Sequence, residues 1–290
     1  MKQMKDQAEA LRKRLYDMEN PESPKTLAVV SGKGGVGKSN FSLNLGLSLS
    51  KKGHKVLLFD MDIGMGNIDI LLGNSAKSTI VDFFDEKETL KEIVMEGPNQ
   101  LHYIAGGTGL NRLFKLSDEL LQRFIRELSS LLDDYDYVIF DMGAGASEET
   151  LNFILAVDEI VVVTTPEPTS ITDAYAMIKH IHMQNKEIPF LILVNRVSDE
   201  KDGIDTFNRI QTVARRFLDC EVKPLGMIPD DKAVQQAVTK QIPFILNEQS
   251  VASKALLDIT NRFETQTFKE IHSQSKISFV SKLKRFLFER

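Results

Sequence analysis

One short stretch, residues 31–39, constrains the fold of this chain more than any other. It reads Ser-Gly-Lys-Gly-Gly-Val-Gly-Lys-Ser, follows an apolar run at 27–30 and precedes a segment with helical character. A glycine, four further residues and then Gly-Lys-Ser is the phosphate-loop pattern, which works between a strand and a helix. The stretch therefore predicts an α/β fold that binds a nucleoside triphosphate.

The residues of this loop have different expected tasks. Glycines leave the backbone N–H groups free to wrap an anion, which Cβ atoms would obstruct. The amine of Lys38 reaches the β- and γ-phosphates, Ser39 can ligate Mg²⁺, and the following helix presents its positive end. The predicted nucleotide-binding residues here are Gly32, Gly34, Gly35, Val36, Gly37, Lys38, Ser39 and Asn40.

Short apolar runs alternate with helical patterns along the rest of the chain. Expected strands are 27–30, 56–59, 101–104, 137–140, 159–163, 190–194 and 224–228, and expected helices include 38–52, 117–132, 170–184, 204–217 and 250–263. Continuous apolar strands that alternate with helices predict a doubly wound, mostly parallel sheet with helices on both faces. Ligand then binds at the carboxyl ends of the strands.

Acidic residues follow two of these strands. Asp60 and Asp62 come at the end of the second one, and Gly64 and Gly66 behind them allow the backbone to turn. Asp141 ends the strand 137–140, where a phosphate-loop protein carries its Walker B carboxylate for Mg²⁺. We expect a metal and water site here; the alternative for the first two is a strand end with solvated carboxylates.

Lys33 narrows the possibilities, because cradling phosphates requires no lysine one residue after the first glycine. The string 33–39 resembles the deviant Walker A motif of the MinD/ParA family, the SIMIBI class of phosphate-loop proteins. The resemblance implies a slow Mg²⁺-dependent ATPase that forms an ATP-sandwich homodimer, in which Lys33 contacts the partner's nucleotide. It also implies that Asp62 orients the attacking water and that Asp60 supports Mg²⁺ through an outer shell. Gly143 departs from the family, which usually carries proline there. A solvated loop charge is the alternative for Lys33.

The base-binding residues are also suggested by this resemblance. After strand 190–194 the sequence 195–198 lacks the aspartate that closes the guanine-reading motif, which favours ATP over GTP. Glu167 is expected to touch the partner's nucleotide, with a helix-capping role at the positive helix end as the alternative. The adenine frame implied by the resemblance consists of Asn195, Arg196, Ile228, Pro229, Asp230 and Asp231.

Composition limits the remaining choices. With 290 residues, of which 42% are hydrophobic and 27% charged, the chain fits one large α/β domain with short appendages. The net charge of −5 argues against nucleic acid as the main partner, and one cysteine, Cys220, excludes a disulfide framework and suits a reducing cytoplasm. We expect a segment at 1–20, a linker at 21–25, an ATPase domain at 26–263, a flexible connector at 264–275 and a terminal helix at 276–290.

The terminal segment 276–290 has the pattern of a basic amphipathic helix. Such a helix suits an anionic membrane surface, where each basic group contributes ~1 kcal/mol, and two copies in a dimer bind better by avidity. The alternative is a helix docked on the protein's own core. Docking and membrane binding are compatible if dimerisation releases the helix. The predicted membrane residues are Phe279, Val280, Leu283, Phe286 and Leu287 on one face, with Lys282, Lys284 and Arg285.

The N-terminal segment carries a second resemblance, to the Asp-Gln-Ala-x-x-Leu-Arg motif of the flagellar FlhG (YlxH) branch of the same family. It implies a helix that stimulates the SRP-type GTPase FlhF and a protein that contacts flagellar C-ring proteins. The implied role is control of flagellar number and placement. The implied location is the cytoplasm, with cycling to the inner face of the cell membrane. A frayed polar terminus is the alternative. The residues of this motif are Asp6, Gln7, Ala8, Leu11 and Arg12.

Three other functions are compatible with the phosphate loop. A ParA-type ATPase that positions DNA or another cargo needs a basic face, which the acidic net charge disfavours. A metallocluster carrier needs a pair of cysteines at its dimer interface, and the chain has one. A nucleotide-gated adaptor without useful hydrolysis has no distinguishing sequence mark.

Overall fold

The computed structural model describes residues 23–62, 66–107, 118–145, 148–271 and 278–288. The strands in chain order are β1 (Lys25–Ser31), β2 (Val56–Met61), β3 (Met95–Glu96), β4 (His102–Ile104), β5 (Tyr137–Ala144), β6 (Glu159–Thr164), β7 (Phe190–Val197) and β8 (Val222–Pro229). The helices are α2 (Lys38–Lys51), α3 (Ile68–Leu71), α4 (Ile80–Phe84), α5 (Asp118–Leu132), α6 (Glu148–Ala156), α7 (Pro168–His182), α8 (Glu200–Leu218), α9 (Lys232–Thr239), α10 (Val251–Ile271) and α11 (Phe279–Phe288), with 3₁₀ turns η1 (Pro98–Gln100) and η3 (Phe244–Leu246).

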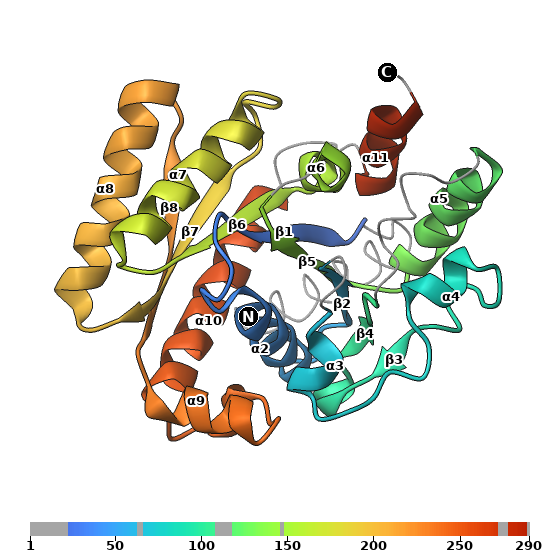
Figure 1. Ribbon diagram of the computed structural model, residues 1–290, viewed down its shortest axis with the longest axis horizontal. Coiled ribbons are helices and arrows are strands. Elements are labelled where there is room, and N and C mark those ends of the chain that lie inside the picture. Colours follow the sequence, from blue (N-terminus) through green and yellow to red (C-terminus); the bar gives the residue numbers. More distant parts are fainter. Residues whose placement is uncertain (1–22, 63–65, 108–117, 146–147, 272–277, 289–290) are drawn as a thin grey trace, which may run out of the picture.

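These strands form one eight-stranded sheet in the order β3-β4-β2-β5-β1-β6-β7-β8 (Figure 1). Neighbouring strands are parallel except at the β3–β4 edge, where the pairing is antiparallel. The predicted doubly wound, mostly parallel architecture is confirmed. The two-residue strand β3 was not predicted, because its sequence is too short to show an alternating pattern.

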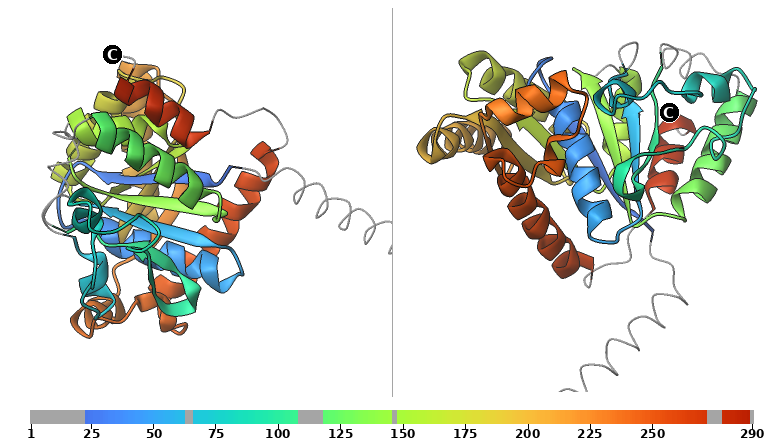
Figure 2. Two further views of the ribbon diagram at one scale, coloured as in Figure 1. Left: turned by 90° about the vertical axis from the view of Figure 1, so that its right-hand side faces the viewer. Right: turned by 90° about the horizontal axis from the view of Figure 1, so that it is seen from below.

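Helices cover both faces of the sheet (Figure 2), and a hydrophobic core lies on each face. Ala28 and Val30 of β1 point into the core under α5, α6, α7, α8 and α11. Leu27 and Val29 point the other way, into the core shared with α2 and α10. Side chains of a strand alternate between its two faces, so a strand that is apolar at every position must be covered on both. This burial holds the carboxyl ends of the strands in a fixed register.

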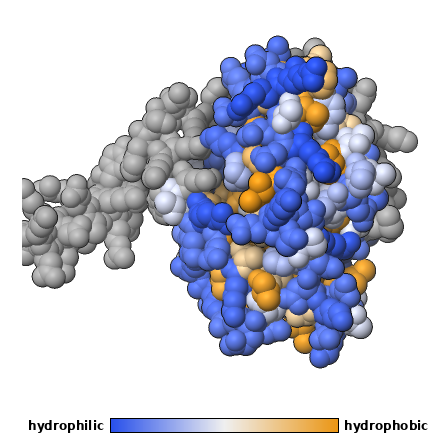
Figure 3. Space-filling model, turned by 90° about the vertical axis from the view of Figure 1, so that its left-hand side faces the viewer, coloured by the Kyte–Doolittle hydropathy of each residue, from blue (hydrophilic) through white to orange (hydrophobic). Residues whose placement is uncertain are grey.

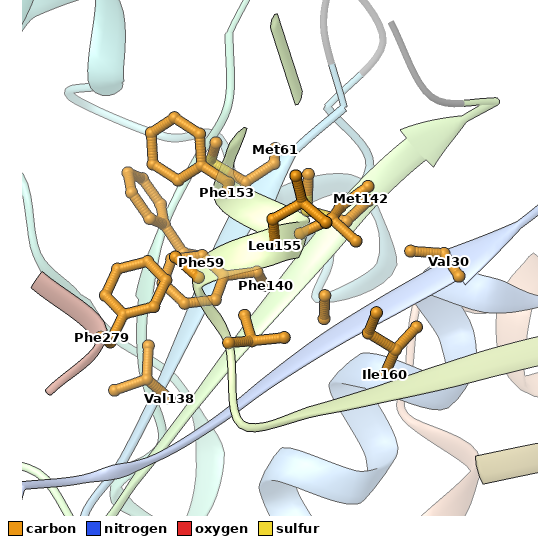
Figure 4. Close-up of a cluster of buried hydrophobic side chains, with 14 of the residues drawn as sticks. Val30, Phe59, Met61, Val138, Phe140, Met142, Phe153, Leu155, Ile160 and Phe279 are labelled. Carbon is orange, nitrogen blue, oxygen red and sulfur yellow. The ribbon is translucent and has the colours of Figure 1, made fainter. Parts of the chain in front are cut away.

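The C-terminal helix α11 packs on the first of these cores. The ring of Phe279 stacks on Phe140 of β5, with 4.8 Å between the ring centroids, and Figure 4 shows Phe153 beside this pair. Leu283 is fully buried, and Lys282 Nζ lies 3.2 Å from Asp158 Oδ1. Docking on the protein's own core, which the sequence left open as an alternative, is therefore the arrangement of this structure.

The remaining residues of α11 divide as the amphipathic pattern predicts. Val280, Phe286 and Leu287 are partly buried against the same core, whereas Lys284 and Arg285 are exposed. The apolar face is thus the one predicted from the sequence, but it is covered by protein.

Two elements of the structure extend beyond the predicted segment boundaries. Helix α10 continues to Ile271, so residues 264–271 belong to a helix and not to a flexible connector. This stretch contains neither proline nor glycine, and Glu264 is held by an ion pair with Lys52 and by His54, whose Nε2 lies 2.7 Å from its carboxylate. Strand β1 begins at Lys25, inside the predicted linker, because its amine pairs with buried Glu159 at 2.9 Å.

On the face shown in Figure 3 the hydrophobic side chains lie in small separate groups, and hydrophilic residues predominate. Within the described ranges no helix is both long and apolar enough to cross a membrane. The N-terminal residues of interest, namely Asp6, Gln7, Ala8, Leu11 and Arg12, lie outside these ranges.

Candidate nucleotide-binding site

The phosphate loop connects β1 to α2 and is held from both sides. Gly32 lies directly against the backbone of α7, since a Cβ atom there would come within 2.1 Å of the Asp173 carbonyl oxygen. On the other side, Asn195 Nδ2 donates a hydrogen bond of 2.8 Å to the Val36 carbonyl. Gly35 and Gly37 have φ angles of 78° and 94°, which glycine adopts without strain. The loop is therefore shaped before any ligand binds.

Helix α2 begins without a side-chain cap. Its N-cap residue is Gly37, which cannot provide a hydrogen-bond acceptor for the first N–H groups. These groups, together with the helix dipole, favour an anion at this point. Ser39 and Asn40 lie in the same first turn, as predicted for residues around a phosphate chain.

A buried ion pair fixes Lys38 beside β5. Its Nζ lies 3.2 Å from Asp141 Oδ1, and Lys38 and Asp141 side chains are 7% and 0% exposed. Ser42 Oγ, one turn further along α2, donates a 2.9 Å hydrogen bond to the same oxygen. Ser42 was not predicted, although its position four residues after Lys38 on a helix could have indicated it.

The second oxygen of Asp141 is suited to a cation or its water shell. Asp141 Oδ2 is buried and has no hydrogen-bond partner in the described part of the chain. An unsatisfied buried acceptor costs ~1–3 kcal/mol, which a bound cation or water offsets. Among the described residues no three His, Cys, Asp or Glu side chains could hold a metal, so Mg²⁺ fits here only with Ser39 and phosphate oxygens as further ligands.

Asp60 lies next to Asp141, because the two residues are in register on neighbouring strands β2 and β5. Its Oδ1 accepts the Asp62 N–H at 3.0 Å, and its Oδ2 accepts the N–H groups of Asn67 at 2.9 Å and Ile68 at 3.3 Å. Burial, with the nearby charge of Asp141, raises the pKa of Asp60 to about 7 despite these bonds. The carboxyl group thus holds the loop after β2, and its outer-shell metal role stays a prediction.

Asp62 is half-buried beside the same ion pair. Burial and the charge of Asp141 raise the pKa of Asp62, although Lys38 acts in the opposite direction. A Cβ atom on Gly143 would lie 3.2 Å from Asp62 Oδ1, so Gly143 leaves room for this carboxylate. A carboxylate with a raised pKa accepts a proton more readily than a solvated one, which suits the predicted handling of water.

Lys33 and Glu167 contact each other on the rim of the loop. Lys33 Nζ lies 3.0 Å from Glu167 Oε2 and 3.3 Å from Thr169 Oγ1, and the two charged side chains are 42% and 61% exposed. Glu167 is the N-cap residue of α7, but its side chain makes no cap hydrogen bond. In the single chain the two residues therefore pair with each other, and their predicted contacts with a partner's nucleotide stay predictions.

A cavity of about 310 Å³ opens beside the start of α2. It lies between the first turn of that helix and the ends of β7 and β8, and its use by adenine stays a prediction. Ile228 is a predicted member of the adenine frame that does not line this cavity, because its side chain is 3% exposed and points into the core. The lining residues are Gly37, Asn40, Asn195, Arg196, Pro229, Asp230, Asp231, Val234, Gln235 and Val238.

The α9 side of this cavity was not predicted. Val234, Gln235 and Val238 come from α9, and no motif in the sequence marks them. Asp231 supports this wall, because one of its oxygens accepts the Ala233 N–H at 2.8 Å and the other accepts the Ala252 N–H at 3.3 Å. Its carboxylate thus joins the starts of α9 and α10.

Comparison with known proteins identifies the family. A sequence model of the ParA family, described as NUBPL iron-transfer P-loop NTPase, matches residues 23–264. The chain belongs to the ParA/MinD family of P-loop NTPases. It is 37% identical over 288 residues to the flagellum site-determining protein YlxH of Helicobacter pylori, covering 94% of this chain and 96% of YlxH. It is 36% identical over 215 residues to the antiactivator FleN of Pseudomonas aeruginosa, covering 74% of this chain and 77% of FleN.

Solved structures agree with this fold. The MinD cell division protein of Aquifex aeolicus superposes with a TM-score of 0.67 at 24% identity, over 88% of this chain and 99% of that protein. The septum site-determining protein MinD of Pyrococcus horikoshii, complexed with Mg-ADP, gives a TM-score of 0.67 at 22% identity, over 88% and 100%. The description of the family model mentions iron transfer, and a metallocluster carrier needs a pair of cysteines. This chain has one cysteine, Cys220, which is buried in the core.

The close packing of Gly32 predicts a specific sensitivity to substitution. Gly32→Ala forces its methyl group against the Asp173 backbone, and overpacking of this kind costs about 1–3 kcal/mol of unfolding free energy. Gly34→Ala is the matched control, because the nearest atom to its new methyl group lies 4.0 Å away. Denaturant unfolding of both nucleotide-free variants measures the difference, and equal stability of the two would contradict the observed packing.

The raised pKa of Asp60 predicts a pH dependence of stability. Aspartate in the unfolded chain titrates near ~3.9, whereas Asp60 titrates at about 7 in the fold, so the folded state retains a proton between these values. The unfolding free energy therefore falls as pH rises through this window. The unfolding free energy of Asp60→Asn minus that of the wild type is expected to be about 3 kcal/mol larger at pH 8 than at pH 5, because asparagine does not titrate. Nucleotide-free denaturant unfolding at both pH values measures this gain; a pH-independent difference would refute it.

Proposed function

We propose that this protein is a slow, Mg²⁺-dependent ATPase that dimerises face to face when both copies hold ATP. The observation that carries the proposal is the division between the two lysines of the loop. Lys38 is buried on Asp141, whereas Lys33 is exposed on the rim and its amine is directed to Glu167. A rim lysine adds little to phosphate binding in its own chain but is available to a second copy.

The residues around the loop support phosphoryl transfer to water. Lys38, Ser39 and Asp141 would hold the triphosphate and Mg²⁺, and the bound ion would neutralise charge on the phosphate oxygens. Asp62 orients the water and accepts its proton, helped by its raised pKa. Lys33 of the second copy adds positive charge to the transferred phosphate.

The cavity beside α2 supports adenine as the base. Asn195 and Arg196 lie near the end of β7 and line the cavity, and the sequence after this strand lacks the aspartate that would recognise guanine. Pro229 and Asp230 supply the facing wall. We infer that ATP is preferred to GTP on these grounds.

We further propose that dimerisation frees α11 for membrane binding. Its apolar face, which includes Phe279 and Leu283, suits either the protein core or a lipid surface, but not water. Lys284 and Arg285 are already exposed and available to anionic headgroups. A monomer with α11 docked would be cytoplasmic, and an ATP dimer would attach to the inner face of the cell membrane with two helices.

The biological role we propose is control of flagellar number and placement. It is supported by the names of the relatives, an antiactivator and a flagellum site-determining protein, and by the motif Asp6–Arg12. In this role the segment 1–20 stimulates the SRP-type GTPase FlhF, and the folded domain contacts flagellar C-ring proteins. A ParA-type ATPase that positions DNA is less well supported, because the net charge is −5.

The dimer proposal is tested by size-exclusion chromatography with light scattering. Wild type and Asp62→Ala are expected to become dimers with Mg·ATP, and the latter to lose at least ~100-fold in turnover because it lacks the group that handles water. Lys33→Ala is expected to stay a monomer, whereas Lys201→Ala, on exposed α8, behaves as wild type. A monomeric Asp62→Ala protein saturated with Mg·ATP would overturn the proposal.

The membrane proposal is tested by co-sedimentation with anionic vesicles. Lys284→Glu with Arg285→Glu reverses two exposed charges, and we expect at least ~10-fold weaker binding of the ATP-bound protein. Arg215→Glu with Arg216→Glu, at the end of α8, is the matched control because it makes the same charge change on an exposed helix end. Equal loss in both pairs would indicate non-specific attraction and sink the assignment of α11.

A further inference from the structure

Asn44, in the middle of α2, has a fully buried side-chain amide. Its exposed fraction is 0%, and its neighbours Leu43 and Leu45 are buried in the core. A buried amide costs stability unless its hydrogen-bonding groups are satisfied. Asn44 satisfies both ends of its amide: one partner, Asn40, lines the cavity, and the other, Ile245, belongs to the turn η3 that follows the cavity-lining helix α9.

The orientation of the Asn44 amide is fixed by backbone groups. Its Oδ1 accepts the Ile245 N–H at 2.9 Å, and a backbone N–H can only donate. Its Nδ2 donates to the Asn40 carbonyl at 2.7 Å, and a carbonyl can only accept. The two ends of this amide therefore cannot be exchanged.

This orientation in turn fixes the side chain of Asn40. Asn44 Nδ2 also donates to Asn40 Oδ1 at 2.9 Å, so the oxygen of Asn40 is turned toward the helix. The NH₂ group of Asn40 is then the end that remains, and it donates to no residue in the described part of the chain. Because Asn40 lines the cavity, its free donor is available to a hydrogen-bond acceptor of a bound nucleotide.

Asn44 also contacts the turn that follows the cavity-lining helix α9. Ile245 belongs to η3, which follows α9, the helix that carries Val234 and Val238. The Phe244 carbonyl of η3 accepts a hydrogen bond of 2.7 Å from Ser253 of α10. Asn44 thus connects the first turn of α2, through Asn40, to the turn that follows α9.

We infer that Asn44 is a positioning residue for nucleotide binding, which holds Asn40 with its NH₂ group presented to an acceptor on the nucleotide. The inference rests on the proposed function, since it requires that ATP or ADP binds in this cavity. Asn44 itself is buried and does not line the cavity, so it would act on the nucleotide only through Asn40.

The test is a double-mutant cycle with Mg·ADP, measured by calorimetric titration of the full chain. Asn40→Ala removes the donor, and we expect about tenfold weaker binding. Asn44→Ala leaves the Asn40 amide unrestrained and is expected to weaken binding several-fold. In the Asn40→Ala background, Asn44→Ala is expected to cause no further loss, because the group that it positions is gone.

A second variant reverses the polarity of the contact. Asn44→Asp keeps an acceptor for the Ile245 N–H but turns the donor toward Asn40 into an acceptor. The Asn40 amide then rotates, presents its oxygen to the nucleotide, and weakens binding by more than Asn44→Ala does. Ser48→Ala is the matched control, since Ser48 is a buried polar residue one turn further along α2 whose hydroxyl has no partner among the described residues.

The outcomes separate the inference from the proposed function. If the wild type itself fails to bind Mg·ADP, the proposed function fails. If the wild type binds and Asn40→Ala or Asn44→Ala binds equally well, the positioning role of Asn44 is wrong. The positioning role is also wrong if the losses of binding free energy from the two single variants add up in the double variant. Additive losses would show that Asn44 affects binding independently of Asn40. GDP titrated in parallel locates the acceptor: a loss confined to ADP assigns it to adenine, and a shared loss to the ribose or phosphates.

Discussion

The site depends on the buried ion pair between Lys38 and Asp141. An ion pair removed from water carries a desolvation cost, which strong geometry and additional hydrogen bonds must offset. Here Ser42 donates to the same carboxylate oxygen, and the pair joins α2 to β5. The phosphate loop, Asp62 and the strand edge are all positioned relative to this contact. A buried ion pair adds little net stability, so its position beside the phosphate loop is better explained by a role in the nucleotide site.

Strand β5 brings the nucleotide site and the C-terminal helix into close connection. Asp141 faces α2, and the preceding residue, Phe140, faces the opposite core and stacks on Phe279 of α11. Because neighbouring residues of a strand point to opposite faces, one strand contacts both elements. In the proposed cycle, undocking of α11 breaks this ring stack and the contact between Lys282 and Asp158. Asp158 also accepts hydrogen bonds from Thr26 at the start of β1, so both ends of the folded domain meet at this carboxylate.

Most of the architecture could be predicted from local patterns. The phosphate loop, the continuous apolar strands and the acidic strand ends all follow from short-range sequence, and the structure contains every predicted strand. The errors occur where local signals are weak. Helix α10 exceeds its predicted end because Glu264 contacts Lys52 and His54, which are far away in the sequence. Ile228, expected in the adenine frame, has its side chain in the core because this position falls on the buried face of β8, and its contact with a nucleotide stays a prediction.

The sequence by itself determined the class of fold and the chemical groups of the site, because glycine conformation, strand burial and helix ends are local properties. Only the tertiary structure decided which of these groups touch. The register of β2 and β5 brings Asp60 beside Asp141, and packing of α2 against η3 brings the Ile245 N–H to the Asn44 oxygen. It also decided that α11 is docked, since an amphipathic helix suits a core as well as a membrane, and the choice depends on the surface that the rest of the chain offers.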